Sequence, residues 1–148
     1  MIAVDSNILV YAHREDSPWH IPAGERLTGL AESDSPWAIP WPCVHEFLGI
    51  VTNPRIYKRP SLLPEALAQV EAWFECPSLH VIGEMTGYWE VLGAHLRSGR
   101  IIGSMVHDAK IVAICQQHGI QEIWSADRDF SRFEGIHIAN PLLRSSEE

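Results

Sequence analysis

Short apolar runs alternate along the chain with longer segments in which apolar residues recur every three or four positions. The short runs are typical of buried strands in a parallel sheet, because such strands are covered by helices on both faces. Five strands are expected: Ile2–Asp5, Trp37–Pro40, Leu79–Ile82, Glu122–Ser125 and Ile136–Ile138.

The segments with helical spacing lie between these runs. Proline near the start and glycine just past the end bound several of them, as is common for helices. Six helices are expected: Ile8–His13, Pro18–Glu32, Cys43–Thr52, Pro64–Glu75, Thr86–Ser98 and Gly103–His118. The alternation predicts an α/β fold with a mostly parallel sheet. A chain of 148 residues has the size of one domain, which we expect to cover residues 1–142, with a short C-terminal tail over 143–148.

Composition narrows the setting of the protein. No apolar run is long enough to cross a bilayer and the N-terminus lacks the features of a signal peptide, so a cytoplasmic location is expected. The three cysteines, Cys43, Cys76 and Cys115, include no Cys-x-x-Cys pair and indicate neither a disulfide framework nor a zinc site. We expect them to be small buried side chains. The six tryptophans are expected to serve packing before base stacking.

The formal net charge of −8 argues at first against binding to nucleic acid, because phosphate contacts normally rest on Lys and Arg. A cluster of acids that binds a metal, however, lowers the net charge without repelling a phosphate, since the ion reverses the local field. Four basic residues are candidate phosphate contacts: Arg97, Arg100, Lys110 and Arg128.

Two acids follow predicted strands. Asp5 ends the first run and Asp127 comes just after the run that ends at Ser125. Ligands of open α/β sheets bind at the carboxyl ends of the strands, so both positions are candidates for function, and Asp129 is close enough along the chain to join Asp127. The alternative is that Asp5 caps the next helix and that Asp127 caps a short helix through Arg132.

Two further acids border the buried faces of predicted helices. Asp108 shares a helix face with Ile111 and Val112, and a carboxylate is costly to bury there without a partner. Glu46 borders the apolar stripe of its own helix, where a solvated position at the rim is an equally good explanation.

Together, the four acids are expected to meet in one crevice at the carboxyl edge of the sheet. Clustered carboxylates repel one another unless they are protonated or neutralised by a cation. Oxygen ligands without an accompanying set of His or Cys favour Mg²⁺ or Mn²⁺ over zinc. The sequence therefore predicts a divalent-cation site formed by Asp5, Glu46, Asp108 and Asp127.

The chain resembles a PIN domain, and more narrowly the VapC toxin of a toxin–antitoxin pair. The resemblance extends from about Ile2 to Pro141 and rests on four places in the sequence: Asp5 with Ser6 and Asn7, Glu46, Asp108 with Ala109, and the segment Ser125 to Phe130. It implies a single PIN domain with a parallel five-stranded sheet and metal-dependent endoribonuclease activity with Mg²⁺ or Mn²⁺. It also implies an RNA substrate, a homodimer and inhibition by a VapB-type antitoxin.

The same resemblance assigns roles to residues. Asp5, Glu46, Asp108 and Asp127 match the catalytic acidic pocket, with Asp5 and Asp108 as the principal metal ligands. Asp129 matches a further acid that is sometimes present, and Ser6, Asn7 and Ser125 are supporting polar residues. The reaction implied is hydrolysis of an RNA phosphodiester by a metal-activated water, with no protein nucleophile.

Two other classes also place an aspartate after the first strand of an α/β sheet. A magnesium-dependent phosphatase of the haloacid dehalogenase type would use Asp5 as nucleophile, but it needs a second Asp where this chain has Asn7. A receiver-type phosphoacceptor domain needs an acidic pair before its main Asp and a Lys after a late strand, and neither is visible in this sequence.

Overall fold

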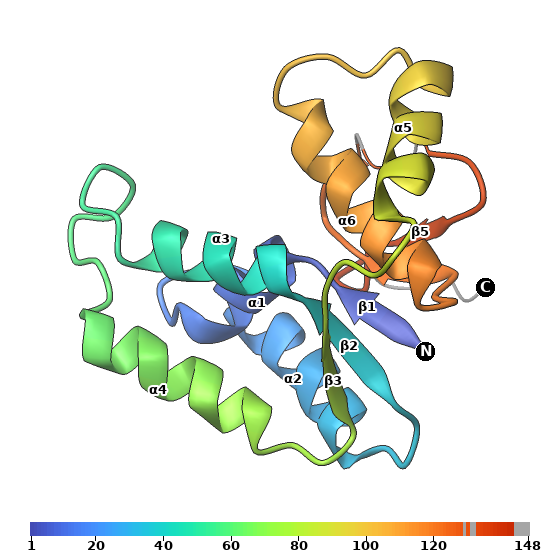
Figure 1. The fold of residues 1–148 in the computed structure, drawn as a ribbon. Helices are drawn as coiled ribbons and strands as arrows, with labels where there is room; N and C mark the ends of the chain where they lie inside the picture. Colours follow the sequence, from blue (N-terminus) through green and yellow to red (C-terminus); the bar gives the residue numbers. More distant parts are fainter. Residues whose placement is uncertain (129, 131–132, 144–148) are drawn as a thin grey trace.

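The computed structural model of the chain describes residues 1–128, 130 and 133–143. Within these residues, five strands form one sheet in the order β3-β2-β1-β4-β5, and all neighbouring strands are parallel. The strands are β1 (Ile2–Val4), β2 (Trp37–Pro40), β3 (Leu79–Ile82), β4 (Glu122–Trp124) and β5 (His137–Ala139). The predicted α/β fold with a parallel five-stranded sheet is confirmed (Figure 1).

Helices connect the strands and form two groups. The described residues contain α1 (Ser6–His13), α2 (His20–Glu32), α3 (Trp41–Val51), α4 (Leu63–Phe74), α5 (Tyr88–Ser98) and α6 (Met105–Gln117). Figure 1 shows α1 to α4 gathered on the left and α5 with α6 on the right. Right-handed crossovers explain this division, because the chain moves from β1 to β3 in one direction and then returns past β1 to β4. None of the described helices is long and apolar enough to cross a membrane.

The central strand β1 lies where the direction of the chain across the sheet reverses. Its neighbours are β2, which follows it directly, and β4, which comes much later along the chain. Val4 pairs with Trp124, and the N–H of Asp5 donates to the carbonyl oxygen of Trp124 at 2.9 Å, so the two strands end at the same level. The residues after β1 and β4 therefore meet at the carboxyl edge, where open α/β sheets bind their ligands.

The helices begin one or two residues away from their predicted starts, and at α1 and α6 the cause is a single residue. Helix α1 begins at Ser6 rather than Ile8, because the carboxyl group of Asp5 accepts the N–H of Ser6 and caps the helix. Helix α6 begins at Met105 rather than Gly103, because Gly103 has a φ of +59°, outside the right-handed helical region.

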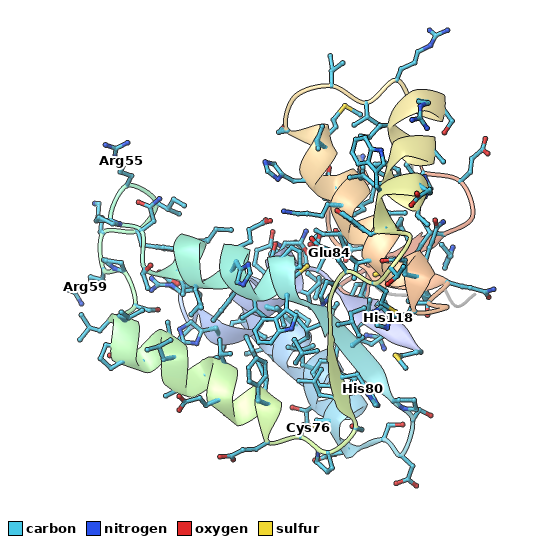
Figure 2. All side chains as sticks on the ribbon, in the orientation of Figure 1. Arg55, Arg59, Cys76, His80, Glu84 and His118 are labelled. Atoms are coloured by element: carbon cyan, nitrogen blue, oxygen red, sulfur yellow. The ribbon has the colours of Figure 1, made fainter. Side chains whose placement is uncertain are left out.

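The loop between α3 and α4 is fixed to the end of α1 by a buried arginine. Arg14 forms two hydrogen bonds to Asp16, from Nε to Oδ1 at 2.9 Å and from Nη2 to Oδ2 at 2.6 Å. Its Nη1 donates to the carbonyl oxygen of Arg59 at 2.9 Å, and its guanidinium carbon lies 3.9 Å from the centre of the Tyr57 ring. The side chains of Arg55 and Arg59 extend outward from this loop (Figure 2), so the loop presents positive charge to solvent.

Candidate metal centre and active site

Among the predicted acids that the structure describes, Asp5 is the most enclosed, with 4% of the residue exposed, and each of its carboxyl oxygens has its own donors. Oδ1 accepts the N–H of Ser6 at 2.8 Å and the thiol of Cys43 at 3.6 Å. Oδ2 accepts the hydroxyl of Ser125 at 2.8 Å and Nδ2 of Asn7 at 3.3 Å. These contacts hold the carboxyl group in one orientation.

Burial changes the acidity of this carboxyl group. Removal from water raises the pKa of Asp5 from its ordinary value of 3.8 to about 6. Hydrogen bonds from Ser125 and Ser6 favour the ionised form and oppose the shift, whereas the nearby negative charge of Glu46 adds to it. Within the described part of the chain, no Lys or Arg forms an ion pair with Asp5. A cation at this position would therefore offset a charge for which the described residues provide no ion pair.

Glu46 reaches the same place from α3. The hydroxyl of Ser6 donates to Glu46 Oε1 at 2.7 Å, while the N–H of Ser6 binds Asp5. One serine thus connects two carboxyl groups that repel each other. Glu46 is exposed, as the rim alternative requires, yet its carboxyl group belongs to the hydrogen-bond network of Asp5.

The segment after β4 completes this network. Asn7 donates from Nδ2 to the hydroxyl oxygen of Ser125 at 3.0 Å and accepts the N–H of Ala126 at its Oδ1 at 3.1 Å. The N–H of Asp127 donates to the same serine oxygen at 3.0 Å. Ser125 therefore fixes the backbone of Asp127 next to Asp5, as the two strand ends predicted.

Asp108 lies half-buried in the first turn of α6. A negative charge interacts favourably with the N-terminal end of a helix, which suits a carboxylate at this position. Ile111 and Val112 are buried, so the helix face that carries them packs into the core as predicted. The hydrogen bonds around Asp5, as far as the described residues show them, do not include Asp108.

The oxygen donors at this edge suit a hard divalent cation. Among residues 1–128, 130 and 133–143, no group of three or more His, Cys, Asp and Glu side chains is arranged to hold a metal ion. Mg²⁺, however, keeps several waters and is commonly bound by one or two carboxylates together with substrate phosphates. Asp5 and Glu46 are the two carboxyl groups that a shared donor, Ser6, brings together at this edge. Burial raises the pKa of the Cys43 thiol well above its ordinary range, so in the absence of a metal the thiol stays protonated and donates to Asp5.

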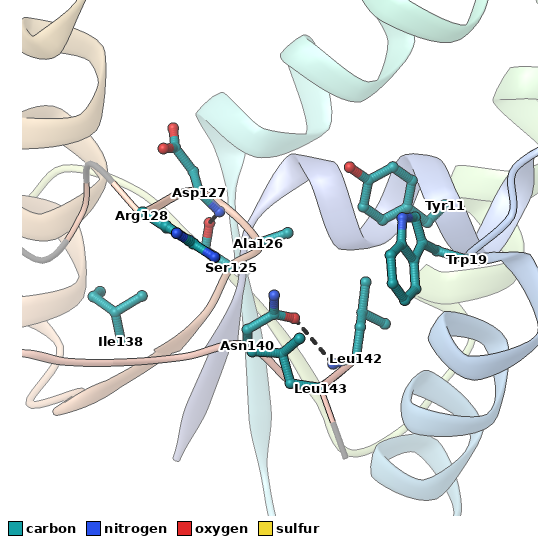
Figure 3. A pocket seen from close by; sticks show the side chains of 10 residues that line it. All are labelled: Tyr11, Trp19, Ser125, Ala126, Asp127, Arg128, Ile138, Asn140, Leu142 and Leu143. Carbon is teal, nitrogen blue, oxygen red and sulfur yellow. Dashed lines mark hydrogen bonds between the residues drawn. The ribbon is translucent and has the colours of Figure 1, made fainter. Parts of the chain in front are cut away.

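A cavity of about 580 Å³ opens beside the segment after β4 (Figure 3). Tyr11 and Trp19 form one wall, Ser125 and Asp127 contribute to a second, and residues after β5, including Asn140, form a third. The carboxyl group of Asp127 points away from the aromatic wall. The other three predicted acids do not line this cavity, so it adjoins the acidic site without containing it.

The family model for the PIN domain matches residues 2–136 of this chain. The chain belongs to the PIN domain family. Ribonuclease VapC48 of Mycobacterium tuberculosis is 35% identical to it over 139 residues, which cover 93% of this chain and 95% of that protein. The resemblance to a PIN domain that the acids and their neighbours indicate is thus confirmed at the level of the family.

Solved structures share the fold of this PIN domain. The crystal structure of VapC20 from Mycobacterium tuberculosis, described as a sarcin-ricin loop cleaving toxin, matches with a TM-score of 0.67 and 20% identity, covering 92% of this chain and 97% of that one. VapBC2 from Rickettsia felis, bound to a DNA fragment from its promoter, matches with a TM-score of 0.66 and 18% identity, covering 94% and 98%. At these identities, the likeness supports the fold alone.

Within this PIN domain, the predicted site residues fall into two groups. Asp5, Glu46 and the backbone of Asp127 are joined through Ser6 and Ser125. The hydrogen bonds that join the described residues around Asp5 do not include Asp108, and Asp129 lies outside the described residues. The catalytic and metal-binding roles of all these acids remain predictions.

The four candidate phosphate contacts differ in position. Arg128 is exposed and lines the cavity beside the acidic site. Lys110 is half-buried on α6, whereas Arg97 and Arg100 are exposed at the end of α5 and in the loop beyond it. Of the four, Arg128 is the residue for which the structure provides a direct connection to the site.

Several residues around the site were not expected from the sequence. Tyr11, Trp19 and Asn140 line the cavity, and the Cys43 thiol faces Asp5. Asn140 is the residue directly after β5, just as Asp5 is the residue directly after β1. Because ligands bind at the carboxyl ends of the strands, its place in the sequence was a signal for Asn140. The two aromatic residues have no such signal.

Of the three cysteines, which were all expected to be buried, Cys43 and Cys115 are buried and Cys76 is half-buried.

Proposed function

We propose that this PIN domain is a divalent-metal-dependent endoribonuclease and the toxin of a VapBC-type toxin–antitoxin system. The observation that carries the proposal is the buried carboxyl group of Asp5, connected through Ser6 to Glu46 and through Ser125 to Asp127 at the carboxyl edge of the sheet. Relatives that match over nearly their whole length are named VapC ribonucleases, which supports the same activity for this chain.

The proposal gives each acid a role. Asp5 and Asp108 are the principal metal ligands, and Asp127 and Glu46 complete the shell or orient the attacking water, with Asp129 as a further candidate. Ser125 and Asn7 keep both oxygens of Asp5 in place through their hydrogen bonds. A bound Mg²⁺ or Mn²⁺ ion would supply the Lewis acid that activates water and neutralises charge at the scissile phosphate.

A reaction that uses Asp5 itself as nucleophile is not favoured by the residues of this site. A phosphatase of the haloacid dehalogenase type needs a second carboxylate where this chain has Asn7, and the amide of Asn7 donates to Oδ2 of Asp5 at 3.3 Å. The phosphatase and phosphoacceptor alternatives therefore find no support in the site, and the family match does not support them either.

The proposal also names partners. A VapB-type antitoxin would inhibit the enzyme, which agrees with the names of the relatives as VapC ribonucleases. We also propose that the chain forms a homodimer and that it acts on RNA in the cytoplasm.

An RNase assay tests the proposal directly. We expect the purified chain to cleave single-stranded RNA in buffer containing Mg²⁺ or Mn²⁺, and we expect EDTA to reduce cleavage to background. Addition of Mn²⁺ in excess of the chelator should restore it, because the acids at the carboxyl edge remain able to bind the ion. Cleavage that persists in EDTA would contradict the metal dependence, and the absence of any cleavage would contradict the activity.

A further inference from the structure

The cavity beside the acidic site has walls of two chemical kinds. On one side are the aromatic rings of Tyr11 and Trp19, together with the aliphatic side chain of Leu142. On the other side, Arg128 and Asn140 contribute polar groups beside the aliphatic side chains of Ile138 and Leu143. A ligand that fits must therefore present a flat apolar face and a polar edge, which is the chemistry of a nucleobase.

Trp19 is held as a platform although its side chain is accessible. Its N–H donates to the hydroxyl of Ser17 at 3.1 Å, and its carbonyl oxygen accepts the N–H of Ala23 at 2.9 Å, so its backbone is fixed at the start of α2. The predicted start of helix α2 was Pro18, but the helix begins at His20 because Ser17 and Trp19 form a turn before it. Trp19 is nevertheless 42% exposed, which leaves its ring free to stack on a ligand.

Asn140 supplies a fixed polar group opposite this platform. Its Oδ1 accepts the N–H of Leu142 at 3.0 Å, which fixes the orientation of the amide. Figure 3 shows Nδ2 of the same amide directed into the cavity. The N–H of Ser125 donates to the carbonyl oxygen of Ala139 at 3.0 Å, which ties this segment to the end of β4. The polar group therefore has a fixed position relative to the acidic site.

The cavity adjoins the acidic site, because the segment Ser125–Asp127 is a wall of the cavity and also part of the Asp5 network. If the proposed function holds and an RNA phosphate lies at Asp5, this shared segment places the cavity beside the nucleotides that flank that phosphate. The carboxyl group of Asp127 points away from the aromatic wall, which leaves that wall to an uncharged ring (Figure 3).

We propose that this cavity is a nucleobase subsite, in which Trp19 and Tyr11 stack on one unpaired base of the RNA beside the scissile phosphate and Asn140 donates to the edge of that base. The subsite rests on the proposed ribonuclease function. It selects single-stranded RNA, because only an unstacked base can enter an aromatic cavity.

The test is an abasic scan combined with substitution of Trp19. The cut site of the full-length protein is first mapped on a single-stranded RNA oligonucleotide, and each base near the cut is then removed in turn. We expect one abasic position next to the cut to lower kcat/KM by about tenfold, the usual effect of losing one base–aromatic stack. Trp19→Ala should lower kcat/KM for the intact RNA by about the same factor, and the abasic position should then cause no further loss. Trp19→Phe should recover most of the activity.

Trp89→Ala is the matched control, because Trp89 is 64% exposed on α5 and does not line the cavity. If the wild-type protein cleaves RNA but the scan shows no sensitive position, the subsite is wrong and the ribonuclease function stands. The subsite is also wrong if the loss of kcat/KM caused by Trp19→Ala is no larger than that caused by Trp89→Ala. If the wild-type protein cleaves no RNA, both proposals fail.

Discussion

Replacing Asp5 by Asn is expected to lower the rate of RNA cleavage by at least about a hundredfold. Loss of residues that only support metal ligands already costs about 10- to 100-fold, and Asp5 is proposed as a ligand itself. The fold should survive, because the Asn side-chain oxygen can still accept the N–H of Ser6 and cap α1. The measurement is kcat on single-stranded RNA with saturating Mn²⁺, together with a circular dichroism spectrum of the variant.

Asp34→Asn is the control for the loss of one negative charge. Asp34 is exposed in the turn before β2, at the opposite edge of the sheet from Asp5. The Asp34→Asn variant should cleave RNA at the wild-type rate. A folded Asp5→Asn variant that cleaves as fast as Asp34→Asn would remove Asp5 from the mechanism.

The second large effect concerns stability in the absence of metal. The pKa of Asp5 is about 6 in the folded chain and 3.8 ordinarily, so between these values the folded state keeps a proton that the unfolded state loses. The contribution of Asp5 to stability is therefore complete below about pH 4 and is lost as the pH rises through about 6. At 1.36 kcal/mol per pKa unit, the shift corresponds to about 3 kcal/mol.

The pH dependence is isolated by comparing the wild type with Asp5→Asn, which has no titrating group at this position. We expect urea unfolding in EDTA to show that the free energy of unfolding of the variant, relative to that of the wild type, rises by about 3 kcal/mol between about pH 4 and about pH 7. Mg²⁺ or Mn²⁺ should stabilise the wild type at about pH 7 and leave the variant unchanged, because the ion binds the ionised carboxyl group. If the two proteins differ in free energy of unfolding by the same amount at both pH values, the folded state does not destabilise the ionised carboxyl group of Asp5.

The fold followed from the sequence because its periodicities are strong. All five strands overlap the predicted runs, and β2 and β3 have the predicted bounds. The differences lie at helix starts, where a single capping group or a left-handed glycine decides the first turn. Asp5 is an example, because it caps α1 through Ser6, as the capping alternative predicts, while its other oxygen accepts the hydroxyl of Ser125; its catalytic role stays a prediction.

The site was predictable only in part. Asp5 and Asp127 follow strands, so parallel topology alone brings their backbones together, and Ser6 and Ser125 were expected as supporting residues. The hydrogen bond from Ser6 to Glu46 was not predictable, because it depends on how α1 and α3 pack. The place of Trp19 in the cavity also could not be predicted. Nothing in the sequence indicates that the turn before α2 lies next to the end of β5.

The most direct test of the central claim is to locate a bound ion. Crystals of the full chain soaked in Mn²⁺ would show its position by anomalous scattering. The account predicts a strong peak at bonding distance, about 2.0–2.3 Å, from a carboxyl oxygen of Asp5, with Asp108, Glu46 or Asp127 supplying a second oxygen. A crystal with no peak at Asp5, or with manganese held by residues outside these four acids, would contradict it.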